Sequence, residues 1–140
     1  MPISAKAYAH VRLTVTDIAR SRAFYDDIFD FTVAYEVPAD ADAATREALG
    51  FLFGGVIYHV GDGLFGLRPV APGSDRFDED RVGLDHISFA LPSRAAVDAA
   101  AAVLDDLGIA HGGVKDIGGA CILEFRDPDN IALELFAPAT

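Results

Sequence analysis

The stretch HISFAL, residues 86–91, repeats the pattern of HVRLTV, residues 10–15, and this repeat decides the fold. Each stretch opens on a histidine and then alternates in the way that is typical of a strand with one buried face. In the first stretch Val11, Leu13 and Val15 share the apolar face. The histidine therefore faces away from the apolar side in both predicted strands.

An amphipathic helix is predicted after each of these strands. In TDIARSRAFYDDIFDF, Thr16 or Asp17 is the expected N-cap, and apolar residues recur at helical spacing. In PSRAAVDAAAAVLDDLG, Ser93 is the expected N-cap, and Gly108 is expected just past the end of the helix. Each helix thus has an apolar face to bury against its own strand.

Three more strands are predicted after each helix, which gives each half the order β-α-β-β-β. They are FTVAYEV, GGVIYHV and LFGLRPV in the first half, and a short strand near AHGGV, then ACILEF and NIALELF, in the second. The segment PADADAATREALGF interrupts the first half and is interpreted as a short Ala-rich helix or a lid.

This duplication predicts an α+β fold in which two paired βαβββ modules form a curved mixed sheet with the helices on its outer face. We expect a single domain over residues 1–140, with module 1 at about 6–70 and module 2 at about 83–137. The Pro-, Gly- and charge-rich residues 71–82 are predicted to link the modules.

The composition restricts the partners and the location. The net charge is -11, with 22 acidic and 11 basic residues, which disfavours binding to nucleic acid or to an anionic membrane. The only cysteine, Cys121, cannot form an intrachain disulfide and is interpreted as a small core residue. The start of the chain lacks the pattern of a signal peptide, and no apolar run approaches the roughly 20 residues of a membrane helix, so we expect a cytoplasmic protein.

Three polar side chains are predicted to converge on the concave face of the sheet, which we call the cup. His10 and His86 face away from the helices, and Glu134 does the same because Leu133 and Leu135 on either side of it face the helices. Two imidazoles and one carboxylate are the donor set of a facial triad for a divalent metal, with open positions for substrate or water. Each of the three residues taken alone is more often a surface or hydrogen-bonded core residue; the repeat favours the metal interpretation.

Other polar residues are predicted by strand alternation to face the cup. His59 does so if Val56 and Tyr58 pack inward, and it is then a candidate for an acid-base role; the alternative is a histidine at the rim without function. Arg12 and Arg68 are candidates for binding a substrate carboxylate or, alternatively, for pairing with an acid of the protein. Tyr8 is expected at the mouth of the cup.

The segments HVRLTVTDIARSRAFYDDIFDF, GLDHISFAL and FRDPDNIALELF resemble the signature segments of the vicinal oxygen chelate superfamily. This superfamily contains glyoxalase I, extradiol dioxygenases, methylmalonyl-CoA epimerase, fosfomycin resistance enzymes and bleomycin resistance proteins. The resemblance implies that His10, His86 and Glu134 are metal ligands. It places Gly66 at the fourth ligand position, and Asn130 where the turn before the last strand usually has glycine.

The departures from the family pattern bear on the subfamily. Gly66 cannot bind a metal, which disfavours glyoxalase I and the epimerase, where Glu or Gln is expected. The remaining ligand set resembles that of extradiol dioxygenases and fosfomycin enzymes, but those enzymes tend to have Tyr at the position of Glu124. Glu124 is therefore a candidate general base, with a solvated edge-strand carboxylate as the equal alternative. Bleomycin resistance proteins lack the metal ligands present here.

The resemblance therefore implies a metal-dependent enzyme that binds Fe, Mn, Zn or Ni and acts on a small metabolite whose adjacent oxygens chelate the metal. Glu124, or else His59, is expected to move a proton, which favours isomerase or lyase chemistry slightly over an extradiol-type ring cleavage. The alternatives are a non-catalytic protein that binds a cationic antibiotic, as bleomycin resistance proteins do, and a fold that keeps the triad without binding metal. Homodimers are common in the superfamily, with cups built within one chain or across two.

Overall fold

The computed structural model describes residues 1–139 and divides into two units, Met1–Asp75 and Arg76–Thr140. Each unit contains one four-stranded mixed sheet, so the α+β class and the duplicated βαβββ order are confirmed. The division falls inside the predicted linker at residues 71–82. Each unit is described below by itself.

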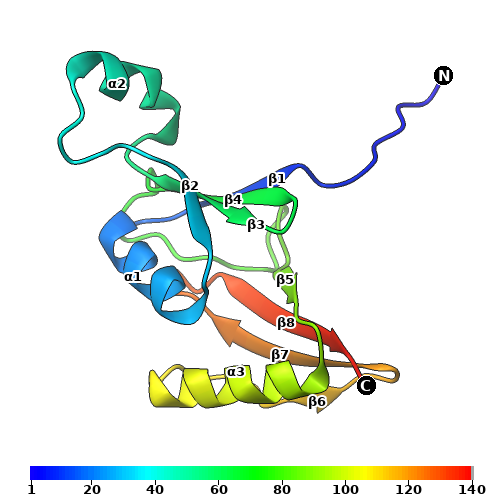
Figure 1. Cartoon of the computed structure of the whole chain (residues 1–140). Coiled ribbons are helices and arrows are strands. Elements are labelled where there is room, and N and C mark those ends of the chain that lie inside the picture. The colour runs from blue at the N-terminus through cyan, green and yellow to red at the C-terminus, as the bar shows by residue number, and fades with distance from the viewer. Residues whose placement is uncertain (140) are drawn as a thin grey trace. The chain divides into compact units, whose positions relative to one another are not determined.

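The first unit begins with a strand and helix and ends with a hairpin (Figure 1). Its elements are β1 (His10–Thr14), α1 (Ile18–Ile28), β2 (Thr32–Glu36), α2 (Ala43–Ala48), the 3-10 helix η1 (Gly50–Leu52), β3 (Val56–Val60) and β4 (Gly63–Arg68). The strand order is β1-β4-β3-β2, with β1 parallel to β4 and the other pairs antiparallel. The segment interpreted as a short helix or a lid thus forms α2 and η1.

The second unit repeats this arrangement without the inserted helices. Its elements are β5 (Ile87–Ala90), α3 (Arg94–Asp106), β6 (Lys115–Asp116), β7 (Ala120–Arg126) and β8 (Ala132–Pro138). The order is β5-β8-β7-β6, with β5 parallel to β8 and the other pairs antiparallel. Figure 1 shows α3 running beside β7 and β8.

The helix ends follow the expected capping residues. Asp17 caps α1 by accepting a hydrogen bond from the Arg20 amide at 3.1 Å, and Ser93 caps α3 by accepting one from the Ala96 amide at 3.2 Å. Gly108 follows α3 with a φ of 69°, a left-handed conformation that glycine adopts without strain. Both helices therefore begin where the sequence predicts, and α3 also ends there.

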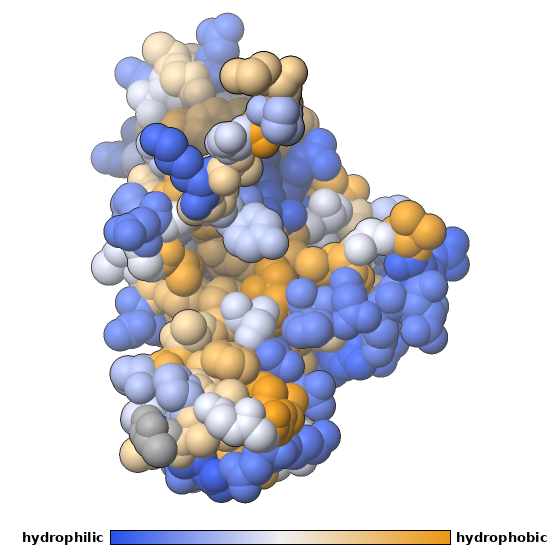
Figure 2. Space-filling view, turned by 90° about the vertical axis from the view of Figure 1, so that its right-hand side faces the viewer, coloured by the Kyte–Doolittle hydropathy of each residue, from blue (hydrophilic) through white to orange (hydrophobic). Residues whose placement is uncertain are grey.

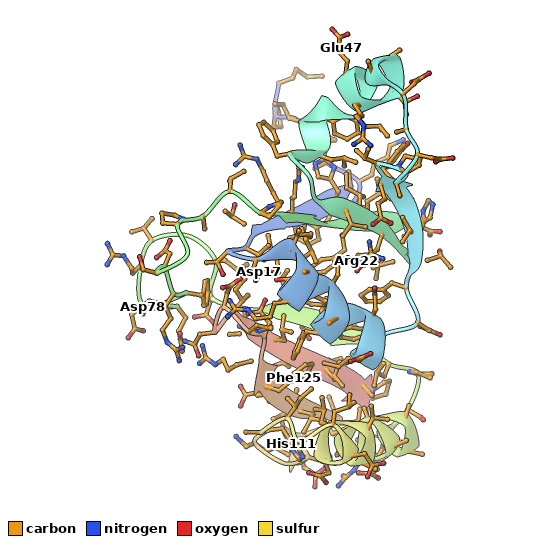
Figure 3. The ribbon with its side chains drawn as sticks, turned by 90° about the vertical axis from the view of Figure 1, so that its left-hand side faces the viewer. Asp17, Arg22, Glu47, Asp78, His111 and Phe125 are labelled. Carbon is orange, nitrogen blue, oxygen red and sulfur yellow. The ribbon has the colours of Figure 1, made fainter. Side chains whose placement is uncertain are left out.

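Each unit buries its apolar strand faces under its own helix. In the first unit Tyr25 of α1 packs on Phe65 of β4, with ring centroids 5.3 Å apart. Figure 3 shows Arg22 on the same helix projecting toward β2, where its guanidinium pairs with Glu36. The second unit buries mainly aliphatic side chains and one thiol: Val97, Leu104, Cys121, Leu123, Leu133 and Leu135. This confirms Cys121 as a core residue and places the alternate residues of β8 on the opposite face of the sheet.

One strand differs from the prediction. The short strand expected near residues 110–114 lies instead at Lys115–Asp116, and the earlier residues contribute only a bridge between His111 and Phe125. Gly113 has a φ of 75°, and its amide donates to Nδ1 of His111 at 3.0 Å. The left-handed conformation of Gly113 interrupts the extended backbone, and pairing with β7 resumes at Lys115 one residue out of register with the bridge at His111.

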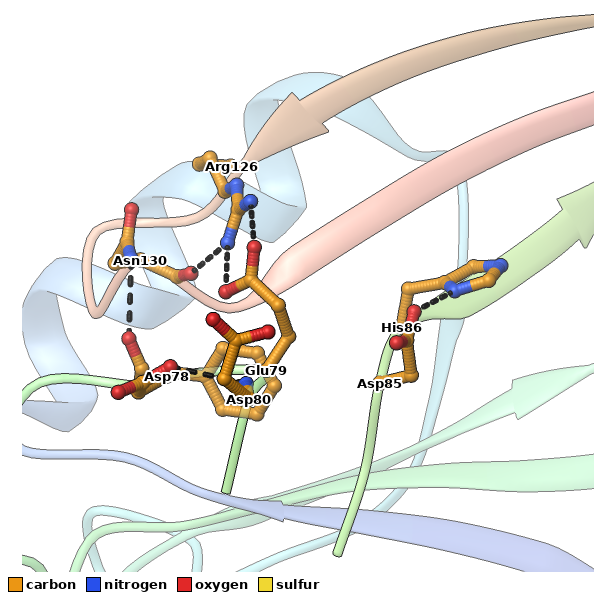
Figure 4. Close-up of polar contacts among 8 residues, drawn as sticks. Asp78, Glu79, Asp80, Asp85, His86, Arg126 and Asn130 are labelled. Carbon is orange, nitrogen blue, oxygen red and sulfur yellow. Dashed lines mark hydrogen bonds and ion pairs between the residues drawn. The ribbon is translucent and has the colours of Figure 1, made fainter. Parts of the chain in front are cut away.

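Part of the predicted linker is bound to the turn between β7 and β8. The Phe77 amide donates to the Asp129 carbonyl at 2.9 Å, and Asn130 Nδ2 donates to the Phe77 carbonyl at 3.0 Å. Arg126 forms a two-pronged ion pair with Glu79, at 2.5 and 2.9 Å (Figure 4). Around these contacts the charged linker forms a hydrophilic projection, seen at the right of Figure 2. The sequence predicts the linker but not this attachment.

The turn itself has the expected conformation. Asn130 has a φ of 67°, so asparagine adopts the left-handed conformation at the position where the family usually has glycine. Asp127 Oδ1 accepts hydrogen bonds from the amides of Asp129 and Ile131, both at 2.8 Å. Within residues 1–139, no helix is long and apolar enough to cross a membrane.

Candidate functional site

The second unit brings two of the three predicted metal ligands together. His86 directly precedes β5, and Glu134 lies on the adjacent parallel strand β8, opposite Ser88. Nε2 of His86 is 3.8 Å from Oε2 of Glu134. The Glu134 side chain is only 13% exposed, which is low for a carboxylate, whereas that of His86 is 44% exposed. The pair is therefore open on the side of the imidazole.

Two neighbouring side chains fix the direction of these donors. Asp85 Oδ1 lies 2.6 Å from His86 Nδ1 (Figure 4), and Ser88 Oγ donates to Glu134 Oε1 at 2.7 Å. Each contact occupies the atom that points away from the pair and leaves Nε2 and Oε2 facing one another. The hydrogen bond with Asp85 also raises the pKa of His86 above its ordinary value; desolvation opposes this, and the charge of Glu134 adds to it.

This arrangement fits one divalent cation. Metal–nitrogen and metal–oxygen distances are about 2.0–2.2 Å, so two donors on one ion are separated by at most about 4 Å. The 3.8 Å between Nε2 and Oε2 lies within that span. Carboxylate contacts to the second nitrogen of a ligating histidine are also typical of metal sites. Among residues 1–139, no three His, Cys, Asp or Glu side chains form a group that could hold a metal ion. The structure thus provides two donors, and the triad with His10 of the first unit stays a prediction.

A pocket of about 410 Å³ surrounds this pair within the second unit. Glu124 of β7 lines it and lies directly opposite Glu134 in the antiparallel register. Like charges at such a position are destabilising unless a cation compensates them. Lys115 Nζ, 3.2 Å from Glu124 Oε2, compensates one carboxylate. The second carboxylate, Glu134, is the one that faces His86.

His111 also lines this pocket, and the sequence analysis missed it. Its Nδ1 accepts from the Gly113 amide at 3.0 Å, and its Nε2 lies 2.8 Å from Asp105 Oδ1. Because Nδ1 accepts a hydrogen bond, the proton lies on Nε2, which donates it to Asp105 at the end of α3. The imidazole ring (Figure 3) therefore connects α3 to the segment that follows it. Both nitrogens are in use, so we interpret His111 as structural. The only sequence feature that could have indicated a structural role for His111 is its position among glycines directly after the helix.

The first unit has its own pocket, of about 320 Å³, on the face that carries His10. Its lining contains the predicted residues His10 and Arg12 together with mainly apolar side chains: Val11, Tyr35, Phe51, Ile57, Leu64 and Gly66. The guanidinium of Arg12 donates from one terminal nitrogen to the Phe51 carbonyl at 2.7 Å, while its Nε is buried without a hydrogen-bond partner. Burial, and then the charge of Arg68, lowers the pKa of Arg12.

The two pockets are built on the same register with opposite charges. Gly66 lies opposite Arg12 in the parallel pair β1–β4, just as Glu134 lies opposite Ser88 in the parallel pair β5–β8. A Cβ on Gly66 would come within 3.0 Å of Arg12 Cγ. The missing side chain therefore gives space to the arginine. The first unit therefore has a glycine at the position equivalent to Glu134, and its cation lies on β1 at the position equivalent to Ser88.

The remaining predicted site residues lie outside both pockets. Arg68 places its guanidinium 4.2 Å from the centroid of the Phe53 ring. His59 is exposed on β3, on the same face as Ile57, because Val56 and Tyr58 are buried. Tyr8 precedes β1 and is 96% exposed. Their roles stay predictions.

The fold and the sequence both have relatives among known proteins. A family model described as the Glyoxalase/Bleomycin resistance protein/Dioxygenase superfamily matches residues 7–135. A glyoxylase/bleomycin resistance protein/dioxygenase domain from Frankia sp. EAN1pec is 30% identical, with a TM-score of 0.75 over 96% of this chain and 93% of that one. No curated protein matches significantly.

Two solved structures of lower identity share the fold. Lactoylglutathione lyase from Agrobacterium tumefaciens is 21% identical, with a TM-score of 0.69 over 95% of this chain and 94% of that one. The genomically encoded fosfomycin resistance protein FosX from Listeria monocytogenes is 18% identical, with a TM-score of 0.69 over 97% of this chain and 96% of that one. At these identities the likeness concerns the fold alone.

Proposed function

Because the chain belongs to the glyoxalase/bleomycin resistance protein/dioxygenase superfamily, we propose that it is a divalent-metal-dependent enzyme acting on a small oxygenated metabolite that chelates the metal. Members of this superfamily are often metal-dependent enzymes. The proposed ligands are His10, His86 and Glu134, and the ion is Fe, Mn, Zn or Ni. Isomerase or lyase chemistry with a proton transfer is favoured.

One observation carries this proposal: Nε2 of His86 and Oε2 of Glu134 face each other at 3.8 Å. The Glu134 carboxylate is only 13% exposed and lies opposite Glu124 on the neighbouring strand. Burying a negative charge at such a position costs free energy unless a cation compensates it. Asp85 and Ser88 hold the outward atoms of the pair, so the inward atoms, Nε2 and Oε2, are directed at one another. This is the arrangement expected of a site prepared for a positive ion.

Glu124 is the residue proposed to move the proton. A bound divalent ion would polarise the substrate oxygens that chelate it and so acidify a neighbouring C–H. Glu124 lines the same pocket as His86 and Glu134, and Lys115 holds its Oε2 at 3.2 Å. The other oxygen, Oε1, is left to accept a proton from substrate and return it to a neighbouring atom. His59, exposed outside the pocket, is the weaker candidate for this role.

An extradiol-type dioxygenase is the alternative activity, because the His, His, Glu donor set suits oxygen chemistry at iron equally well. In a ring cleavage by dioxygen, no proton is transferred between substrate carbons, so Glu124 would not have the role of general base proposed above. A protein that only binds a cationic antibiotic is a further alternative, favoured by the net charge of -11.

The experiment loads the metal-depleted protein with Fe(II), Mn(II), Ni(II) or Zn(II) and offers it a panel of 2-hydroxycarbonyl compounds, 2-oxoaldehyde thiol adducts and catechols. Solvent deuterium incorporation followed by NMR reports proton transfer, and an oxygen electrode reports dioxygenase activity. We expect metal-dependent deuterium incorporation without oxygen uptake. Glu124→Gln should abolish incorporation while metal content is kept, and Glu47→Gln on α2 serves as the matched control.

Oxygen uptake with an iron-loaded protein, unchanged by Glu124→Gln, would establish the dioxygenase instead. Tight binding of a basic drug that is indifferent to chelators, with no turnover of any compound, would support the binding protein.

A further inference from the structure

We propose that the pocket of the first unit binds the carboxylate of an apolar or aromatic carboxylic acid, with Arg12 as the residue that recognises the charge. The inference deepens the proposed function and rests on it for the claim that this acid is the substrate. The binding itself is a property of the first unit and does not require the metal.

The positive charge of Arg12 has no carboxylate partner among the residues that the structure describes. Acidic residues outnumber basic ones by 22 to 11 in the chain, yet among residues 1–139 no carboxylate pairs with Arg12 or Arg68. The charge of Arg68 instead adds to the desolvation of Arg12. Arg12 thus lines the pocket near a second positive charge and without an acid partner, which is unfavourable, and a bound anion would compensate its charge.

The Arg12 guanidinium is held in place by a hydrogen bond to the backbone. One terminal nitrogen is anchored on the Phe51 carbonyl at 2.7 Å, and Nε is buried without a hydrogen-bond partner. Nε is out of reach of a ligand, so the planar fork that donates to the two oxygens of a carboxylate is the one formed by the two terminal nitrogens of the guanidinium. The anchor fixes the plane of the fork before a ligand arrives, which lowers the entropy lost on binding.

Gly66 provides the space that the Arg12 side chain occupies. A Cβ at this position would lie 3.0 Å from Arg12 Cγ and 3.3 Å from Ile57 Cγ1. Glycine here is therefore what allows the arginine stem to lie across β4 and reach the Phe51 carbonyl. In the second unit the equivalent position carries Glu134, whereas in the first unit the glycine at this position leaves space for the arginine on the paired strand.

The apolar walls define the rest of the ligand. Tyr35, Phe51, Ile57 and Leu64 line the pocket together with Arg12, and its volume of about 320 Å³ is large enough for a small aromatic or branched acid. Because a single guanidinium lines the pocket, the lining suits one negative charge. His10 lines it too, so the acid group would be bound beside a proposed metal ligand.

The test uses phenylacetate as the probe and phenylacetamide as its neutral isostere. Binding to the full chain is followed by ¹H–¹⁵N NMR titration, first on the protein as purified and again after dialysis against EDTA. We expect phenylacetate to bind at least about tenfold more tightly than the amide, since a charge-assisted hydrogen bond is worth about 1.5–3 kcal/mol. The chelated protein should bind it equally well, with shifts at Gly66 and Phe51.

Arg12→Gln should remove the preference for the acid, and Arg12→Lys should restore it only in part because a single ammonium cannot form the fork. Arg46→Gln is the matched control, because Arg46 also donates only to backbone carbonyls, those of Ala39 and Ala41, but lies on α2. Gly66→Ala gives a second route, since its Cβ displaces the arginine stem and should weaken phenylacetate binding while Arg12 is kept. Thermal unfolding of each variant confirms that it is folded.

Equal affinity for acid and amide, or acid binding unchanged by Arg12→Gln, overturns the inference. Acid binding that disappears on chelation but survives Arg12→Gln also overturns it, while supporting the metal of the proposed function. Acid binding that requires Arg12 in a protein that takes up no metal keeps the inference about the pocket and contradicts the proposed function.

Discussion

Nε2 of His86 and Oε2 of Glu134 face each other across 3.8 Å, at the start of one strand and in the middle of its parallel neighbour. A strand whose other side chains are all apolar thus carries its charge where an imidazole can share a cation with it. The contacts of Asp85 and Ser88 make the direction of both donors a consequence of local structure.

Ser88→Ala tests whether this orientation matters. Without the 2.7 Å hydrogen bond to Oε1, the Glu134 carboxylate can rotate away from His86. We expect metal affinity, measured by competition with a chromogenic chelator, to fall about 10- to 100-fold, as is typical when a group that orients a ligand is removed. Ser88→Thr keeps the hydroxyl on a strand residue and should restore the affinity. Equal affinity in all three proteins would show that Ser88 does not orient the carboxylate.

The strand faces were predictable from the sequence because alternation is a local property of each strand. It correctly placed Glu134 on the face opposite the buried leucines, and His59 on the face opposite the buried Tyr58. The capping residues were predictable for the same reason.

Features that depend on contacts between distant segments were not predictable. Nothing in residues 71–82 indicates that Glu79 binds Arg126, because that pair joins residues 47 positions apart. The anchor of Arg12 on the Phe51 carbonyl depends on where the inserted η1 ends. The strand expected near residues 110–114 is interrupted because Gly113 adopts a left-handed conformation, with its amide donating to His111.

Substitutions at Asn130 test the backbone strain of the turn. With a φ of 67°, an alanine at this position must adopt the left-handed conformation at a cost of about 1–2 kcal/mol, whereas glycine adopts it freely. Both variants lose the 3.0 Å hydrogen bond to the Phe77 carbonyl. Chemical denaturation should therefore find Asn130→Ala less stable than Asn130→Gly by about 1 kcal/mol. If alanine is at least as stable as glycine, the turn is not strained.

The ion pair between Glu79 and Arg126 should make the docking of the linker acid-sensitive. The hydrogen bond from Arg126 lowers the pKa of Glu79 to about 2 from an ordinary value of 4.5. Because the pKa of Glu79 is lower in the folded state than in the unfolded state, its ionised carboxylate stabilises the folded state above pH 4.5. This stabilisation is lost as the pH falls from 4.5 towards 2. Urea unfolding of the wild type and Glu79→Gln should differ at pH 7, and the difference should shrink through that window. A pH-independent difference would show that the charge of Glu79 is not involved.

Tyr58 should produce the opposite dependence at high pH. Burial, together with the 2.7 Å hydrogen bond that its hydroxyl donates to Asp26, raises the pKa of this phenol above its ordinary value of 10. A raised pKa stabilises the folded state fully below pH 10, and this contribution is lost as the pH rises through the folded-state pKa. Thermal unfolding between pH 8 and pH 12 should show a loss of stability that is smaller in Tyr58→Phe. An identical pH profile for both proteins would contradict this assignment.

The most direct test of the central claim is the metal content of the protein purified without a tag, measured by inductively coupled plasma mass spectrometry. The wild type is compared with His86→Ala and Glu134→Gln, and with His59→Ala as a matched histidine variant outside the pockets. The account predicts about one equivalent of a transition metal in the wild type and in His59→Ala, and its loss in the other two variants. A wild type that contains no metal and takes up none of Fe, Mn, Ni or Zn, or variants that keep their metal, would contradict it.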